Sequence, residues 1–113
     1  MKNGVKERLM PFVQKCVAVS CALPAHKKGQ HVSFQLFSSS TRTGATYNEA
    51  LGASTRRDFR FKLCETLKEL REARFWLQIA VAAGWNIENI EELLEEGNEL
   101  VAMLTSACKT LDS

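Results

Sequence analysis

The sequence predicts a small, soluble, all-α protein, and three observations carry this prediction. Three segments repeat apolar residues at the three- and four-residue spacing of an amphipathic helix. A length of 113 residues, with 45% hydrophobic and 25% charged residues, is typical of one globular domain with a modest core. No uncharged apolar stretch approaches the ~18 residues that suggest a membrane span. We therefore expect a single helical-bundle domain over residues 1–113, located in the cytoplasm and without a membrane partner.

The first predicted helix covers residues 5–23. Its apolar residues are spaced 4-3-4-3-4 and are Val5, Leu9, Phe12, Cys16, Val19 and Leu23. Pro11 lies within this pattern, and a proline removes one backbone donor from a helix. The helix is therefore expected either to begin near Pro11 or to bend there. Pro24 and the polar residues 25–29 end it.

Residues 55–83 predict a long helix with three distinct faces. Thr55 with Asp58 makes a plausible capping box, and Gly84 is a natural stop. At about 100° per residue, one face collects the apolar residues Phe59, Leu63, Leu67, Leu70 and Leu77. One flank of this face is basic and consists of Arg57, Arg60, Lys68 and Arg71. The other flank is acidic, contains Trp76, and consists of Asp58, Glu65, Glu69 and Glu72.

The last predicted helix, residues 87–112, has the clearest periodicity. Residues spaced 4-3-4-3-4-3 form its inner stripe and are Ile90, Leu94, Gly97, Val101, Leu104, Cys108 and Leu111. Asn86 or Asn89 can cap its start. Its glutamates are concentrated in the first half, where negative charge complements the helix dipole.

Residues 30–53 are ambiguous on propensity alone. Val32, Leu36 and Phe37 indicate a helix, whereas the Ser/Thr/Gly-rich stretches 38–41 and 43–46 are typical of a loop. Composition favours a linker over 38–46. The alternative is a helix of small residues packed very closely against its neighbours.

Charge is unevenly distributed, although the net charge is only +2. Residues 1–74 contain 14 Lys/Arg against 6 Asp/Glu, and residues 75–113 contain one Lys against 7 Asp/Glu. This asymmetry indicates an anionic partner for the basic part, or self-association through complementary surfaces. The four cysteines and two histidines lack metal-ligand spacing, so we expect no metal, no other cofactor and buried free thiols.

Several motifs in the middle of the chain resemble a known signature. These are Thr43–Ala50, Ala53-Ser54, Asp58-Phe59, Lys62-Leu63, Thr66–Glu69, Arg71–Ala73 and Phe75–Leu77. They resemble the four-helix-bundle family first named for proteins encoded in intervening sequences of 23S ribosomal RNA genes. That family is related in fold to the accessory variability determinant of diversity-generating retroelements. The resemblance covers about residues 30–111.

The resemblance implies an antiparallel, up-down-up-down four-helix bundle, with residues 30–53 as the second helix. It also implies a cyclic homo-oligomer, commonly a pentamer. If the chain belongs to the retroelement branch, the resemblance implies that it binds a reverse transcriptase, and that it binds RNA or DNA through a basic surface. The residues do not distinguish this branch from the ribosomal one.

One set of motif residues is interpreted as a polar network that joins the second and third helices. A hairpin turning near residues 53–54 pairs positions whose numbers sum to about 107, which places Arg42 opposite Glu65, with Glu69 one turn beyond. It also places Glu49 near Asp58 and within side-chain reach of Arg56 or Arg60. The expected network consists of Arg42, Asn48, Glu49, Lys62, Glu65, Glu69 and Glu72. With neither a pocket nor a partner nucleophile in evidence, these carboxylates are expected to be structural, and the protein non-enzymatic.

The basic flank is the best functional candidate. With its neighbours it consists of Arg56, Arg57, Arg60, Lys68, Arg71 and Arg74. It could bind nucleic-acid phosphates, contact an acidic surface of the next subunit, or be solvated in pairs such as Lys68 with Glu72. We find no aromatic interleaving, which would strengthen the first interpretation. The alternative function is an oligomeric, protein-binding scaffold that does not bind nucleic acid directly.

Overall fold

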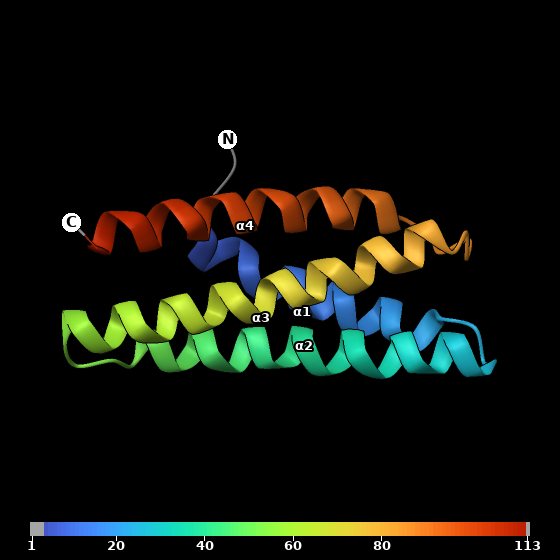
Figure 1. Ribbon diagram of the computed structural model, residues 1–113, viewed down its shortest axis with the longest axis horizontal. Helices are drawn as coiled ribbons and strands as arrows, with labels where there is room; N and C mark the ends of the chain where they lie inside the picture. The colour runs from blue at the N-terminus through green and yellow to red at the C-terminus, as the bar shows by residue number, and fades with distance from the viewer. Residues whose placement is uncertain (1–3, 113) are drawn as a thin grey trace.

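The computed structural model describes residues 4–112, which form four helices. These are α1 (Val5–Ala22), α2 (Lys27–Leu51), α3 (Arg56–Ala82) and α4 (Ile90–Asp112). Successive helices run in opposite directions, and α1 packs on α4 as well as on α2 (Figure 1). The expected all-α, up-down-up-down four-helix bundle is therefore confirmed.

The segment that composition assigns to a linker is helical. Helix α2 runs through residues 38–46 without a break, so the linker interpretation is wrong and the helix that the resemblance implied is correct. Ser39, Ser40 and Thr43 are fully buried. The hydroxyl of Ser39 donates to the carbonyl of Gln35, and that of Thr43 donates to the carbonyl of Ser39. Small side chains that satisfy their own hydroxyl groups allow α2 to approach its neighbours closely.

Helix α1 begins at Val5, six residues before Pro11, so a start near Pro11 is wrong. The N–H of Gly4 donates to Oε1 of Glu7 at 3.0 Å, which stabilises the first turn. Pro11 lies on an exposed face of α1. Pro11 has no N–H to donate to the carbonyl of Glu7, and Glu7 is an exposed residue.

The expected ends of the third and fourth helices are close to those observed. The hydroxyl of Thr55 accepts a hydrogen bond from the N–H of Asp58 at 3.1 Å, so Thr55 caps α3. Gly84 follows the end of α3 with φ 73°, the left-handed conformation that glycine adopts most easily. Helix α4 begins at Ile90, directly after Asn89, which has φ 62°.

The core is formed by the inner faces of all four helices. Its largest fully buried side chains include Phe12 of α1, Leu36 of α2, Leu70 of α3 and Leu104 of α4. None of the helices in the described part of the chain is long and apolar enough to cross a membrane.

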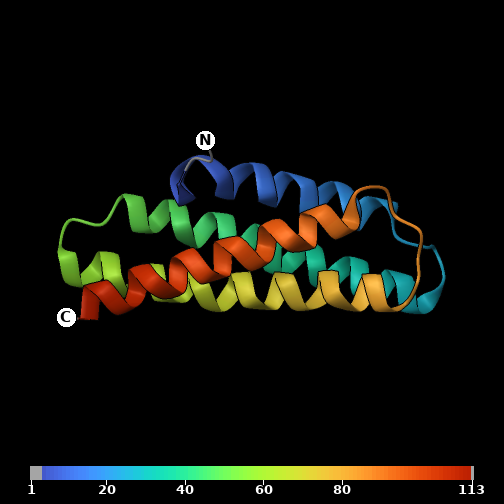
Figure 2. The ribbon, with the colours of Figure 1, turned by 90° about the horizontal axis from the view of Figure 1, so that it is seen from above.

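Helix α1 is the shortest of the four, with 18 residues against 25, 27 and 23 in α2, α3 and α4. The turn between α2 and α3 and the C-terminal end of α4 extend past its first residue (Figures 1 and 2). At that end, the inner faces of α2, α3 and α4 therefore extend beyond the start of α1.

Candidate nucleic-acid interface

Helix α3 carries basic and aromatic side chains along one outward-facing stripe. We call it the basic–aromatic stripe, and it consists of Arg57, Phe61, Cys64, Lys68, Arg71 and Phe75. These positions are spaced 4-3-4-3-4, so they follow one face of the helix. Phe61 is 63% exposed and Phe75 is 47% exposed. Two aromatic rings are therefore open to solvent on the same helix face as the cations.

The expectation that this surface lacks aromatic residues is therefore wrong. Phe75 follows Arg57 by 18 residues, which is five helical turns at about 100° per residue, so the two lie in line. Phe61 follows Arg57 by four residues and lies one turn further along the same face. The sequence thus contained the signal, but only the apolar stripe and the charged flanks of this helix were assigned to faces, and Phe61 and Phe75 were left out.

The cations of this stripe have no ion-pair partner among residues 4–112. Arg57, Lys68 and Arg71 are exposed, and none forms a salt bridge with another described residue. The pair between Lys68 and Glu72 does not form, because the carboxylate of Glu72 accepts hydrogen bonds from Arg42 and from Trp76. The positive charge of the stripe is therefore available to an external anion.

The remaining three arginines of the expected basic surface lie in different settings. Arg56 is exposed in the first turn of α3. Arg60 and Arg74 are half-buried, and the Nε atom of Arg74 is buried without a hydrogen-bond partner among residues 4–112. The aliphatic part of Arg74 lies beside Gly97 of α4. Arg60 and Arg74 are thus less available for binding than the four exposed cations.

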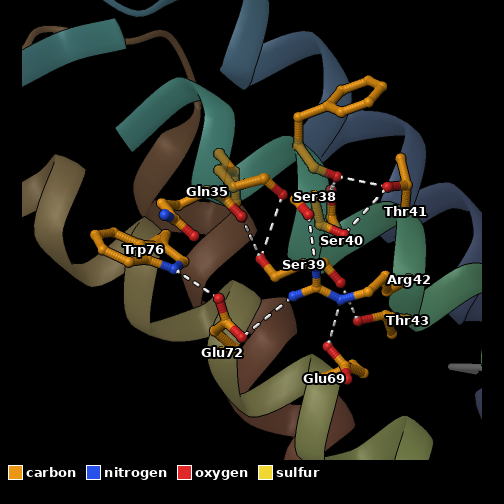
Figure 3. A network of polar contacts seen from close by, with 12 residues as sticks. Gln35, Ser38, Ser39, Ser40, Thr41, Arg42, Thr43, Glu69, Glu72 and Trp76 are labelled. Atoms are coloured by element: carbon orange, nitrogen blue, oxygen red, sulfur yellow. Dashed lines mark hydrogen bonds and ion pairs between the residues drawn. The ribbon is translucent and has the colours of Figure 1, made fainter. Parts of the chain in front are cut away.

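The acidic flank of α3 is occupied by contacts with α2. Nε of Arg42 lies 2.9 Å from Oε2 of Glu69, and its Nη2 lies 3.3 Å from Oε1 of Glu72 (Figure 3). Glu72 also accepts a hydrogen bond from Nε1 of Trp76 at 3.2 Å. The hydrogen bond to Glu69 raises the pKa of Arg42 above its ordinary value.

A second cluster lies nearer to the turn between α2 and α3. Nζ of Lys62 lies 2.7 Å from Oε1 of Glu49 and 3.4 Å from Oε1 of Glu65. The hydrogen bond to Glu49 raises the pKa of Lys62. Asn48, the remaining residue of the expected network, is exposed and forms no side-chain hydrogen bond with a described residue.

The hairpin register places Arg42 opposite Glu65 with Glu69 one turn beyond, and in the structure the guanidinium of Arg42 meets Glu69. Side chains of a helix lean toward its N-terminus, which for α2 is the end away from the turn. The guanidinium of Arg42 accordingly lies level with Ser38, whose hydroxyl accepts a hydrogen bond from Nη1 of Arg42 (Figure 3). It therefore meets α3 at Glu69 and Glu72, about one turn beyond Glu65.

A chain of aromatic contacts supports the exposed ring of Phe75. The centroids of Phe75 and Trp76 are 4.9 Å apart, with an interplanar angle of 76°. Trp76 in turn meets His31 of α2 edge to face, with centroids 5.7 Å apart. Because the indole is also held by Glu72, Phe75 is oriented by a network that spans both helices.

A further polar cluster, between α1 and α4, was missed by sequence reasoning. Nη2 of Arg8 lies 2.8 Å from Oε1 of Glu99, and its Nε donates to Oε2 of Glu96 at 2.9 Å. These two carboxylates raise the pKa of Arg8. Arg8 directly precedes the core residue Leu9, and Glu96 and Glu99 flank Gly97 and Leu100, so all three lie beside the apolar stripes of their helices. Charges at such flanking positions commonly pair between neighbouring helices.

No protein-family model matches this sequence, and no curated protein is significantly similar to it. Among solved structures, the chain is similar to a protein of unknown function from the S23 ribosomal protein family of Bacteroides thetaiotaomicron. The two chains share 29% sequence identity and superpose with a TM-score of 0.81. The alignment covers 93% of this chain and 98% of the other, so the likeness extends over the whole bundle.

Proposed function

We propose that this protein is a non-enzymatic, oligomeric nucleic-acid-binding protein whose basic–aromatic stripe contacts single-stranded RNA or DNA. The observation that carries the proposal is the interleaving of exposed cations without ion-pair partners among residues 4–112 with the exposed rings of Phe61 and Phe75. Similarity to a protein from a ribosomal protein family favours RNA as the first ligand to test.

The chemistry of the stripe suits an unpaired strand. Lys and Arg attract phosphate groups, and arginine can hold a phosphate through two parallel hydrogen bonds. An exposed phenylalanine ring can stack on an unpaired base of any identity. Arg57 and Phe75 are separated by about 27 Å along the helix, at 1.5 Å per residue, which is room for several nucleotides.

Self-association would increase the affinity of such a surface. The family resemblance implies a ring, commonly of five copies, which would present the stripe several times to one strand. Binding of a second stripe to the same strand is then intramolecular, so weak individual contacts combine. The same resemblance makes a reverse transcriptase a protein partner to test. A reverse transcriptase gene beside this one would support that partner, and a 23S ribosomal RNA gene would support the other branch.

The test is fluorescence anisotropy with a labelled single-stranded RNA at several salt concentrations. We expect simultaneous replacement of Arg57, Lys68 and Arg71 by Gln to abolish binding. In the wild type, the affinity should fall steeply with salt, with a slope of about 2 per bound subunit for three phosphate contacts at ~0.7 each. The matched control replaces Lys15, Lys27 and Lys28 by Gln, because these exposed cations lie outside the stripe and the change in net charge is the same.

The aromatic contribution is tested separately by Phe61→Ser and Phe75→Ser. Loss of stacking should weaken binding about tenfold per ring without changing the salt slope. A wild-type protein that binds neither RNA nor DNA at low salt would refute the proposed function.

A second candidate function is a scaffold in which the stripe binds the next subunit instead of nucleic acid. The exposed acidic residues of the α3–α4 connection and the first turns of α4 favour it, and they are Glu88, Glu91, Glu92 and Glu95. In that case, the triple Gln variant would dissociate into monomers of 12.7 kDa, and the wild type would not bind nucleic acid.

A further inference from the structure

The exposed ring of Phe75 is one end of a group of three aromatic side chains that crosses from α3 to α2. The ring centroid of Trp76 lies 4.9 Å from that of Phe75 and 5.7 Å from that of His31. His31 belongs to α2 and is exposed, and Trp76 is half-buried. We call these three residues the aromatic triad. Because Phe75 is also the last residue of the basic–aromatic stripe, the triad continues that stripe onto a second helix.

The middle ring of the triad is held by polar contacts to both helices. Nε1 of Trp76 donates to Oε2 of Glu72 at 3.2 Å, and the other oxygen of Glu72 lies 3.3 Å from Nη2 of Arg42 in α2 (Figure 3). A side chain that is fixed before a ligand arrives loses little conformational freedom when the ligand binds. The indole therefore keeps Phe75 and His31 in a defined arrangement on either helix.

The triad has the chemistry of a site for unpaired bases. Phenylalanine, tryptophan and histidine rings are all surfaces on which such bases stack. Consecutive nucleotides lie ~3.4 Å apart along a stacked strand and further apart along an extended one. A strand with one base on Phe75 can therefore place a nearby base on His31, since a single indole separates the two rings. The adjacent carboxylate of Glu72 is paired with Arg42, so it repels a phosphate less than a free carboxylate would.

A second histidine–tryptophan pair provides an internal comparison. The centroids of His26 and Trp85 are 5.6 Å apart, and their rings meet edge to face like those of His31 and Trp76. This pair joins the α1–α2 and α3–α4 connections, and no ring contact among residues 4–112 links it to Phe75 or Phe61. The two pairs thus differ in their connection to the basic–aromatic stripe.

We infer that the nucleic-acid site extends from α3 onto α2, where His31 stacks on a base of the same strand that contacts Phe75. The inference rests on the proposed function and adds a residue of the second helix to its site. It assigns Trp76 as a positioning residue, because the indole contacts both base-stacking rings. The required ligand is a single strand, since a base within a duplex has no free face for His31.

The first test uses the fluorescence of the two tryptophans separately. Trp85→Phe leaves Trp76 as the only tryptophan, and Trp76→Phe leaves Trp85. Each variant is titrated with single-stranded oligouridine until anisotropy shows saturation. We expect the emission of Trp76 to be quenched, because bases stack on the rings beside it. The emission of Trp85, which has a histidine neighbour at nearly the same distance, should not change.

The second test compares His31 variants on a normal strand and on an abasic strand of equal length, which keeps its phosphates but has no bases. On the normal strand, His31→Ser should weaken binding about tenfold, and His31→Phe should restore it because a ring is present again. On the abasic strand, His31→Ser should bind as well as the wild type. The control is Phe34→Ser, which removes a 69% exposed ring three residues further along α2 and should not change the affinity.

Circular dichroism verifies that each variant is folded, and His31→Gln replaces His31→Ser if the latter does not fold. RNA that binds without quenching Trp76 would overturn the inference and leave the proposed function intact. The same conclusion would follow if the His31 variant lost no affinity, or lost it equally on the abasic strand, because either result excludes stacking of a base on the imidazole. A wild type that binds neither RNA nor DNA would instead refute the proposed function, and this inference with it.

Discussion

The ring of Phe12 in α1 packs directly against the backbone of α4 at Gly97. A Cβ atom placed on Gly97 would lie 3.2 Å from Cε1 and 3.3 Å from Cζ of Phe12. Phe12 is fully buried in the core. Gly97 is therefore the position at which α4 accommodates the largest core side chain of α1.

We expect Gly97→Ala to give no gain in stability, although alanine is the better helix former. The gain of about 0.5–1 kcal/mol from helix propensity should be offset by displacement of Phe12. Gly44→Ala is the matched control, because a Cβ there would lie 3.5 Å from Val13, an ordinary contact. Gly44→Ala should therefore raise the free energy of unfolding, measured in urea, by the whole helix-propensity gain of about 0.5–1 kcal/mol. Equal stabilisation by both substitutions would contradict this account of Phe12.

The connection between α1 and α2 makes a second glycine essential. A Cβ on Gly29 would lie 2.2 Å from the carbonyl oxygen of Pro24, which also accepts a hydrogen bond from Gln30. Because the clash is with the backbone, we expect Gly29→Ala to lower the free energy of unfolding by about 1–3 kcal/mol. Gly52→Ala is the control, since its nearest contact would be at 3.6 Å. A thermal midpoint for Gly29→Ala at or above that of the control would argue against the close approach.

Burial of the Cys16 thiol predicts a dependence of stability on pH. Burial raises its pKa from 9.0 to about 12, so above pH 9 the unfolded chain loses a proton that the native state keeps. The free energy of unfolding should therefore fall as the pH rises from 9 toward 12, by up to ~1.4 kcal/mol per pH unit from this group. Urea titrations at pH 8 and 10.5 should show a smaller decline for Cys16→Ala than for the wild type. Equal declines would show that Cys16 does not contribute.

The two arginine clusters should differ in their contribution to stability. Arg42 is half-exposed, and pairs of this kind contribute at most about 1 kcal/mol. The side chain of Arg8 is only 12% exposed and bonds both Glu96 and Glu99. We expect Arg8→Gln to cost about 1–2 kcal/mol, because two carboxylates lose a charged donor, and Arg42→Gln to cost less. The free energy of unfolding of both variants is measured by chemical denaturation at low and high salt. A larger loss of stability for Arg42→Gln than for Arg8→Gln would contradict this prediction.

Local patterns in the sequence determined most of the helical architecture. The spacing of apolar residues identified α1, α3 and α4, and Thr55 and Gly84 marked the ends of α3, because caps and amphipathic stripes depend on neighbours within a few residues. The outward direction of Phe61 and Phe75 was equally accessible from helical geometry. It was missed because only the apolar stripe and the charged flanks of this helix were assigned to faces.

Tertiary structure decided the features that depend on several helices at once. The Ser/Thr-rich stretch of α2 has a weak helix propensity, and it is helical because its small side chains pack closely against the other helices. Arg42 contacts Glu69 because helical side chains point toward the N-terminus of their own helix, and α2 and α3 are antiparallel. That pairing takes Glu72 away from Lys68 and leaves the stripe cations without partners among the described residues. The extension of α2, α3 and α4 beyond the start of α1 depends on how the four helices pack, a relationship that no local pattern contains.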